Sequence, residues 1–194
     1  VGTVQAATPE SREVGASLVE CGAACTCGPG CPNRVVQRGR GVELANEVEV
    51  FLSVKGKGWG VRATRLIPKG AFVMEYVGEA LELEEATQRR ARQEAQGEMT
   101  FLMVVRENFG GRRQSTCMDA RYEGNVARFV NHSCDPNLTM LCVRTGPARP
   151  RIAMFASRDV SPGEELSISY GDAPGHAPGT DSASAGKGGA TGGG

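Results

Sequence analysis

Short runs of apolar and β-branched residues set the hydrophobic pattern of the chain from Val48 onward. Turn sequences separate these runs, as in Ile67-Pro68-Lys69-Gly70 and Ser161-Pro162-Gly163-Glu164, where proline fixes φ and glycine tolerates a positive φ. Many short strands between such turns indicate a compact fold that is mainly β with short helices. We expect strands at Val48–Val54, Gly60–Ala63, Ala71–Val77, Phe101–Val105, Leu138–Val143, Arg151–Ala156 and Glu165–Tyr170.

One segment departs from the β pattern. Leu81 to Gln96 is rich in Glu, Ala, Gln and Arg, and Glu85 precedes Arg89 by the four residues that suit an ion pair on a helix. We therefore predict a helix here, and a second, short helix over Gly124–Phe129. The polar character of the longer helix indicates a surface insertion, for which a solvated helix without a binding role is the simplest explanation.

Composition limits the classes of function. The chain has 194 residues, of which 40% are hydrophobic, which is enough for one folded domain. Its 22 basic and 22 acidic residues cancel, so no basic field favours direct binding to nucleic acid. No run approaches the roughly 18 apolar residues of a membrane helix, and the start lacks the pattern of a secretory leader. We expect a soluble, unsecreted protein with no membrane partner.

The two ends of the chain differ from its centre. Because the sequence begins with Val1 and not with Met, we expect it to be a piece of a longer protein. Residues 173–194 are mostly Gly, Ala, Ser and Thr, with too few large apolar side chains to offset the entropy of ordering. This composition predicts a disordered tail.

Four of the seven cysteines, Cys21, Cys25, Cys27 and Cys31, fall within a short segment rich in Gly and Pro. Such a segment cannot be held by apolar burial, and four thiolates suit a tetrahedral zinc site that would stabilise folding without taking part in catalysis. Disulfides and unpaired thiols are the alternatives, and the apparent intracellular context disfavours disulfides.

Three further motifs are ambiguous when taken singly. Gly56-Lys57-Gly58-Trp59-Gly60 does not have the spacing of a phosphate loop but allows a ligand close to the backbone, although a hairpin with a core tryptophan would look the same. The polar stretch Arg128–Asn137 contains His132 and Cys134, which form a structural site more often than a nucleophilic pair. The last predicted strand ends in Tyr170, which is also compatible with an ordinary edge strand.

Taken together, the motifs resemble those of SET-domain histone lysine methyltransferases. The resemblance covers about Leu18 to Asp172 and is strongest to members with cysteine-rich flanks, such as the lysine-nine type and the SET–mariner fusion type. The motifs that carry it, in family order, are Cys21–Gln37 with its "NRVVQ" phrase, Lys57–Arg62, Glu75–Glu79, Asp119–Tyr122, Gly124-Asn125, Arg128-Phe129, Asn131–Cys134 and Glu164–Tyr170.

The resemblance implies a SET-domain β-clip with a C-terminal pseudoknot, in which the Asn131–Asn137 segment passes the last strand. It divides the chain into an N-terminal extension (1–17), a partial pre-SET cysteine segment (18–47), the SET domain (48–172) and the tail (173–194). It also implies S-adenosylmethionine as cofactor, structural zinc and a lysine of a histone H3 tail, or of another protein, as substrate, with a nuclear, chromatin location.

Site residues follow from the same resemblance. The cofactor contacts are Lys57, Gly58, Trp59, Phe101, Arg128, Asn131 and His132. The catalytic tyrosines are Tyr76 and Tyr170, and the substrate pocket includes Ile168 and Phe101. The metal ligands are Cys21, Cys25, Cys27, Cys31 and Cys134.

The residues themselves suggest how methyl transfer would proceed. Free lysine has a pKa of about 10.4, and only its neutral amine can accept a methyl group. An apolar channel and an adjacent positive sulfonium would lower this pKa, so no strong base is needed and tyrosine hydroxyls suffice to orient the amine.

Two departures from the family pattern qualify this interpretation. Ile168 stands where the family has Phe or Tyr, and its lack of a hydroxyl predicts more than one methylation. The post-SET cysteines that would join Cys134 are missing after Asp172, so we expect a weakly active or inactive chain. The alternative is a catalytically impaired SET module that acts as a protein-binding scaffold. Peptide specificity would reside in the insertion at roughly Leu83–Gly111.

Overall fold

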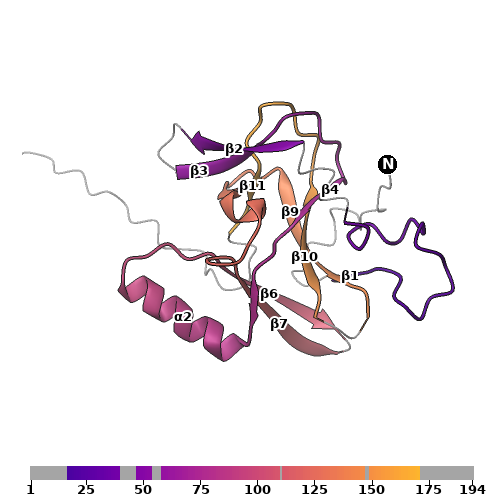
Figure 1. Cartoon of the computed structure of the whole chain (residues 1–194), viewed down its shortest axis with the longest axis horizontal. Coiled ribbons are helices and arrows are strands. Elements are labelled where there is room, and N and C mark those ends of the chain that lie inside the picture. The colour runs from indigo at the N-terminus through magenta and orange to yellow at the C-terminus, as the bar shows by residue number, and fades with distance from the viewer. Residues whose placement is uncertain (1–16, 40–46, 54–57, 110, 147–148, 171–194) are drawn as a thin grey trace, which may run out of the picture.

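The computed structural model describes residues 17–39, 47–53, 58–109, 111–146 and 149–170. Strands dominate these residues, with one α-helix and one short 3₁₀ helix, so the mainly β prediction is confirmed (Figure 1). The elements are β1 (Ser17–Val19), β2 (Val48–Ser53), β3 (Gly58–Ala63), β4 (Phe72–Glu75), β5 (Glu79–Leu81), α2 (Leu83–Ala95), β6 (Leu102–Phe109), β7 (Arg112–Asp119), the 3₁₀ helix η1 (Val126–Phe129), β8 (Asn131–His132), β9 (Leu138–Arg144), β10 (Arg151–Ala156) and β11 (Ser167–Ile168).

Four small sheets make up the described part of the chain. The largest contains β1, β9, β10 and β4 in that order, with β10 antiparallel to both neighbours and β1 parallel to β9. A second sheet has the order β5-β7-β6, and β2 pairs with β3 as a hairpin. The fourth consists of β8 and β11, which run parallel. Figure 1 shows the β2–β3 hairpin and the β6–β7 hairpin at opposite ends of the molecule, with α2 beside the latter.

Strand β10 is central because apolar residues occupy both of its faces. Ile152 and Met154 belong to the main core, while Ala153 and Phe155 belong to a second cluster on the other face. Full burial of an Ile or Met side chain contributes about 1.5–3 kcal/mol. A strand that is covered on both faces is expected to have a continuous run of apolar residues, as β10 does. Burial of these side chains holds β10 between the two clusters.

The structure refines several predicted elements. The helix forms at Leu83–Ala95, and its Arg89 Nη2 lies 2.7 Å from Glu85 Oε1, as the spacing predicted. The predicted short helix near Gly124 is a 3₁₀ turn at Val126–Phe129. The last predicted strand is reduced to Ser167–Ile168 because only these residues pair with β8.

The two ends of the chain are not described. The predicted tail at 173–194 and the residues before Ser17 lie outside the described residues. Among the described residues, no helix has the length and apolar character needed to cross a membrane.

Candidate active site

Two segments that are far apart in the sequence meet as short parallel strands. In β8, Asn131 and His132 pair with Ser167 and Ile168 of β11. The ladder continues at Ser133, whose backbone NH donates to the carbonyl of Ile168 at 3.0 Å. The pairing sets the end of the C-terminal strand against the Asn–His segment, as the expected pseudoknot requires.

Asn137 joins these two segments through a buried amide. Its side chain is 1% exposed, and its Nδ2 donates to the carbonyl of Glu165 and to Oε1 of Glu164, each at 2.9 Å. Its Oδ1 accepts from the backbone NH of Ser167 at 2.9 Å. Asn137 was not among the site residues predicted from the sequence. Its place directly before the apolar run of β9 was the available signal, because a buried amide must find partners.

Tyr170 is held against β8 by both its backbone and its hydroxyl. Its backbone NH donates to His132 Nδ1 at 3.0 Å, and the two rings lie 5.2 Å apart between centroids. Its hydroxyl donates to the carbonyl of Val130 at 3.1 Å. Burial raises the pKa of the Tyr170 phenol, so this hydroxyl stays protonated at neutral pH.

Tyr76 lies deeper in the same region. It is 5% exposed, and its hydroxyl donates to the carbonyl of Phe101 at 2.6 Å. Burial raises the pKa of Tyr76 strongly, and the nearby Tyr170 and Asp119 raise it further. Tyr76 shares the main core cluster with Ile168 of β11, two residues before Tyr170, so both predicted catalytic tyrosines belong to the same region.

The glycine–tryptophan motif meets Asn131 at the edge of β3. Asn131 Nδ2 donates to the carbonyl of Trp59 at 3.2 Å and to Oε1 of Glu165 at 2.9 Å. A Cβ atom on Gly60 would lie 3.2 Å from that Nδ2, so glycine is needed for this close approach. Trp59 is 56% exposed, which excludes the alternative of a core tryptophan and leaves its indole available to a ligand.

Arg128 contributes a buried donor that lacks a protein partner. Its guanidinium carbon lies 4.2 Å from the ring centroid of Phe101 and 5.5 Å from that of Phe129. Its Nε is buried and has no hydrogen-bond partner in the described part of the chain. Buried donors are rarely left unpaired, so a ligand acceptor is expected here.

Ile168 and Lys57 are the remaining predicted residues of the pocket and of the cofactor contacts. Ile168 is 2% exposed and belongs to the same core cluster as Tyr76, against which Phe101 also packs. Lys57 lies outside the described residues. The structure therefore gathers Tyr76, Phe101, Arg128, Asn131, His132, Ile168 and Tyr170 around β8 and β11.

The cysteine segment brings three thiols together. The sulfur atoms of Cys21, Cys27 and Cys31 lie within 4.8 Å of one another, whereas Cys25 is exposed and outside this group. A hydrogen bond from the Arg34 guanidinium lowers the pKa of Cys27, which favours the thiolate that metals bind.

Cys134, the fifth predicted ligand, is also exposed. Its sulfur lies 3.7 Å from His132 Nε2, beside the tyrosine site.

This combination of threaded strands, paired tyrosines and a glycine–tryptophan edge has counterparts among known proteins. Residues 58–171 match the family model described as SET domain. The chain belongs to the SET domain family. Over 154 residues this SET domain chain is 45% identical to the Mus musculus protein named histone-lysine N-methyltransferase SETMAR, in a match that covers 79% of the chain and 48% of the mouse protein.

Solved structures agree with this assignment. The methyltransferase domain of human histone-lysine N-methyltransferase SETMAR matches with a TM-score of 0.68 and 38% identity, covering 83% of this chain and 56% of that one. Kryptonite in complex with mCHH DNA, an H3(1-15) peptide and SAH matches with a TM-score of 0.58 and 34% identity, covering 79% of this chain and 28% of that one. The chain spans about half the length of its mouse relative.

Proposed function

We propose that this chain is an S-adenosylmethionine-dependent protein lysine methyltransferase, with a partial pre-SET segment at 18–47 and the SET domain at 48–172. The observation that carries the proposal is the meeting of Asn131 and His132 with Tyr170 at one place. Relatives named histone-lysine N-methyltransferases support it.

The groups around β8 fit the chemistry of S-adenosylmethionine. Arg128 Nε is a buried donor in need of an acceptor, which the carboxylate or ribose of this molecule offers. The exposed indole of Trp59 provides a flat apolar wall beside Gly58, whose Cβ position is open, whereas the side chains of Phe51, Asn131 and Glu165 already fill that space at Gly60. When bound, S-adenosylmethionine supplies a methyl group on a positively charged sulfur. The residues proposed to hold it are Lys57, Gly58, Trp59, Phe101, Arg128, Asn131 and His132.

The two tyrosines are suited to orienting a lysine amine. Each hydroxyl donates its proton to a main-chain carbonyl, so the lone pairs of each oxygen can accept an N–H from the amine. Both phenol pKa values are raised, so neither tyrosine serves as a base at neutral pH. Burial of the amine beside Tyr76 and the adjacent positive sulfonium would lower the lysine pKa, and the amine releases its proton to solvent before transfer. Alignment then supplies most of the acceleration.

We infer that the substrate is a lysine of the histone H3 tail, which implies action on chromatin in the nucleus. Support comes from the H3(1-15) peptide bound in the Kryptonite structure and from the names of the relatives. The small side chain of Ile168 and its lack of a hydroxyl favour a pocket that accepts an amine already methylated. We therefore propose more than one methylation of the same lysine.

We also propose a structural zinc ion in the cysteine segment. Tetrahedral zinc with Zn–S bonds of about 2.3 Å requires sulfur atoms about 3.8 Å apart. The sulfur atoms of Cys21 and Cys31 lie 3.9 Å apart, which fits this requirement. Cys27 completes the observed trio, and Cys25 is the nearest candidate in sequence for the fourth ligand.

The proposal can be tested with a histone H3 peptide of residues 1–15, the length bound to Kryptonite. The peptide is incubated with the chain and S-adenosylmethionine, and its products are analysed by mass spectrometry. We expect slow transfer, in line with the weak activity expected from the sequence, that places methyl groups on one lysine, with products carrying two or more, and none on a peptide whose lysines are replaced by arginine. A single methyl group at saturation would contradict the role assigned to Ile168. Cofactor binding without transfer would instead indicate a catalytically impaired module that acts as a scaffold.

A further inference from the structure

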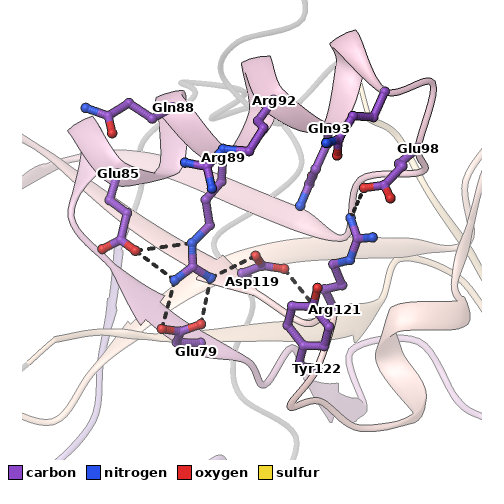
Figure 2. A pocket seen from close by; sticks show the side chains of 11 residues that line it. Glu79, Glu85, Gln88, Arg89, Arg92, Gln93, Glu98, Asp119, Arg121 and Tyr122 are labelled. Carbon is purple, nitrogen blue, oxygen red and sulfur yellow. Dashed lines mark hydrogen bonds and ion pairs between the residues drawn. The ribbon is translucent and has the colours of Figure 1, made fainter.

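A polar pocket lies between α2 and the end of the β5-β7-β6 sheet, apart from the tyrosine pair. It has a volume of about 590 Å³ and is lined by one face of α2, by Glu79 of β5, and by Glu98, Asp119, Arg121 and Tyr122 (Figure 2). Figure 2 shows side chains from α2 pointing across this space toward Asp119 and Arg121.

The floor of the pocket is a closed set of ion pairs centred on Arg89. Its guanidinium donates to Glu79 at 2.6 and 3.0 Å, to Glu85 at 2.7 Å and to Asp119 at 3.2 Å. Asp119 is almost fully buried and also accepts from the backbone NH of Arg121 at 3.0 Å. The donors of Arg89 are thus engaged by carboxylates of the floor, and Arg89 is not free to bind an anion.

An unpartnered acceptor faces this floor from α2. Gln93 is 6% exposed, and its Oε1 is buried without a hydrogen-bond partner among the described residues. A buried carbonyl left without a donor costs about 1–3 kcal/mol. Because Gln93 lines the pocket, a ligand that offers an N–H would satisfy it.

The charge of the lining also favours a donor. Four carboxylates and three guanidinium groups surround the pocket. A hydrogen bond from Arg121 lowers the pKa of Glu98, and one from Arg89 lowers that of Glu79, so both carboxyls are ionised at neutral pH. Arg92, the third cation, is exposed on α2 and can remain in solvent. The pocket is therefore rich in acceptors and carries a net negative charge.

The pocket is connected to the tyrosine site by a short stretch of backbone. Glu98 precedes Phe101 by three residues, which span at most about 10 Å when extended. The carbonyl of Phe101 accepts both the Tyr76 hydroxyl at 2.6 Å and the backbone NH of Ala120, the neighbour of Asp119, at 3.2 Å. A peptide whose lysine reaches Tyr76 can thus place another side chain in the pocket.

We propose that this pocket binds a guanidinium or ammonium side chain of the protein substrate, located a few residues from the methylated lysine. The inference rests on the proposed function, since it assumes that the lysine enters beside Tyr76. It adds a specificity determinant, Gln93 with Glu98, that the tyrosine site does not contain.

Binding of paired peptides tests this assignment without requiring turnover. Each peptide carries one lysine and, two to four residues away, either arginine or its neutral analogue citrulline. Calorimetry with the full chain is expected to show about tenfold tighter binding of the arginine peptide at one spacing, in line with a charge-assisted hydrogen bond. The preference should fall at least threefold in Gln93→Met and in Glu98→Gln, but not in the exposed control Glu84→Gln.

The outcomes separate this inference from the proposed function. Equal affinity for arginine and citrulline peptides at every spacing, in a chain that methylates them, would overturn the pocket assignment alone. If the chain prefers the arginine peptide but methylates neither peptide, the pocket assignment is supported and the proposed methyltransferase activity is contradicted. Spermidine is a further probe. If it binds the pocket while the chain binds arginine and citrulline peptides equally, the site is assigned to free polyamines and its role in substrate binding is refuted. Thermal unfolding of each variant ensures that Gln93→Met is compared as a folded protein, and Glu98→Gln tests the same claim at a more exposed position.

Discussion

Single residues in this site act through partners from distant parts of the chain. Asn131 binds the Trp59 carbonyl, 72 residues away, and the Glu165 carboxylate, 34 residues away. Its amide thereby ties the glycine–tryptophan edge to the pseudoknot. The motif order indicated that Asn131 mattered, but the identity of these partners could not be predicted, because they depend on how the chain threads.

Replacing Asn131 by Ala should weaken cofactor binding more than it weakens the fold. The substitution removes the amide that positions the carbonyl of Trp59, and losing one or two hydrogen bonds corresponds to about tenfold or more in affinity. Calorimetric titration with S-adenosylmethionine measures this, with Gln88→Ala on α2 as the control. Unchanged affinity would show that Asn131 is only a structural residue.

Glu164 should make stability depend on pH in the acid range. A hydrogen bond from Arg158, with further ones from Asn137 and the NH of Ser161, lowers the pKa of Glu164 to about 2. A folded-state pKa below the unfolded value adds stability above the unfolded pKa, and this stability is lost as the pH falls toward 2.

We therefore expect Glu164→Gln to lose about 1–2 kcal/mol at pH 7, a figure reduced because solvent screens the half-exposed Arg158. Urea unfolding at pH 7, 5 and 3 should show the difference from wild type shrinking at pH 3. A difference that grows at low pH would contradict a stabilising role for the ionised Glu164 carboxylate.

Among the elements, the helix and the apolar strands were predictable, whereas a polar strand and the shortest strands were not. The helix α2 and the apolar strands β9 and β10 follow from local composition. Strand β7 was missed because its start, Arg112–Thr116, is polar, and it becomes a strand through pairing with β5 and β6. Tertiary pairing overrode local propensity there. The two-residue strands β8 and β11 likewise exist only because they pair with each other.

Asn137→Ala should destabilise the pairing of β8 with β11. The substitution leaves the buried NH of Ser167 without its acceptor and the carbonyl of Glu165 without its donor. Unsatisfied buried groups of this kind cost about 1–3 kcal/mol each, so we expect a loss of about 2–4 kcal/mol. Urea unfolding measures it, and Gln88→Ala at an exposed position on α2 is the control. A loss within about 0.5 kcal/mol, the size of a typical surface substitution, would show that the Asn137 amide is unimportant.

At the scale of the whole molecule, the cysteine segment is docked on the main sheet. The NH of Glu20 donates to the carbonyl of Arg144 at 2.8 Å, next to the pairing of β1 with β9. The buried Glu20 carboxylate accepts from the NH of Val36 at 2.6 Å, and Arg151 donates to the Val36 carbonyl at 3.2 Å. Order in the cysteine segment is thereby coupled to the sheet that supports the tyrosine site.

Removing zinc should lower the stability of the fold through this coupling. Metal binding to thiolates contributes folding free energy, and a segment this short has little apolar burial to replace it. Elemental analysis should find zinc in the purified chain, and a chelator should lower the melting temperature of the wild type. Cys27→Ser should already melt lower and respond less. A chain that contains no zinc and is insensitive to chelation would contradict the metal assignment.

The central claim is that Tyr170, two residues after β11, orients a lysine for methyl transfer beside β8. Its most direct test is the rate of methyl incorporation into the histone H3 peptide by Tyr170→Phe, with Leu66→Ala, an exposed position outside both proposed sites, as the control. We predict a decrease of about 10²–10³-fold for Tyr170→Phe, typical of removing one aligned polar group, with cofactor affinity retained. Equal rates for the two variants and the wild type would contradict the claim.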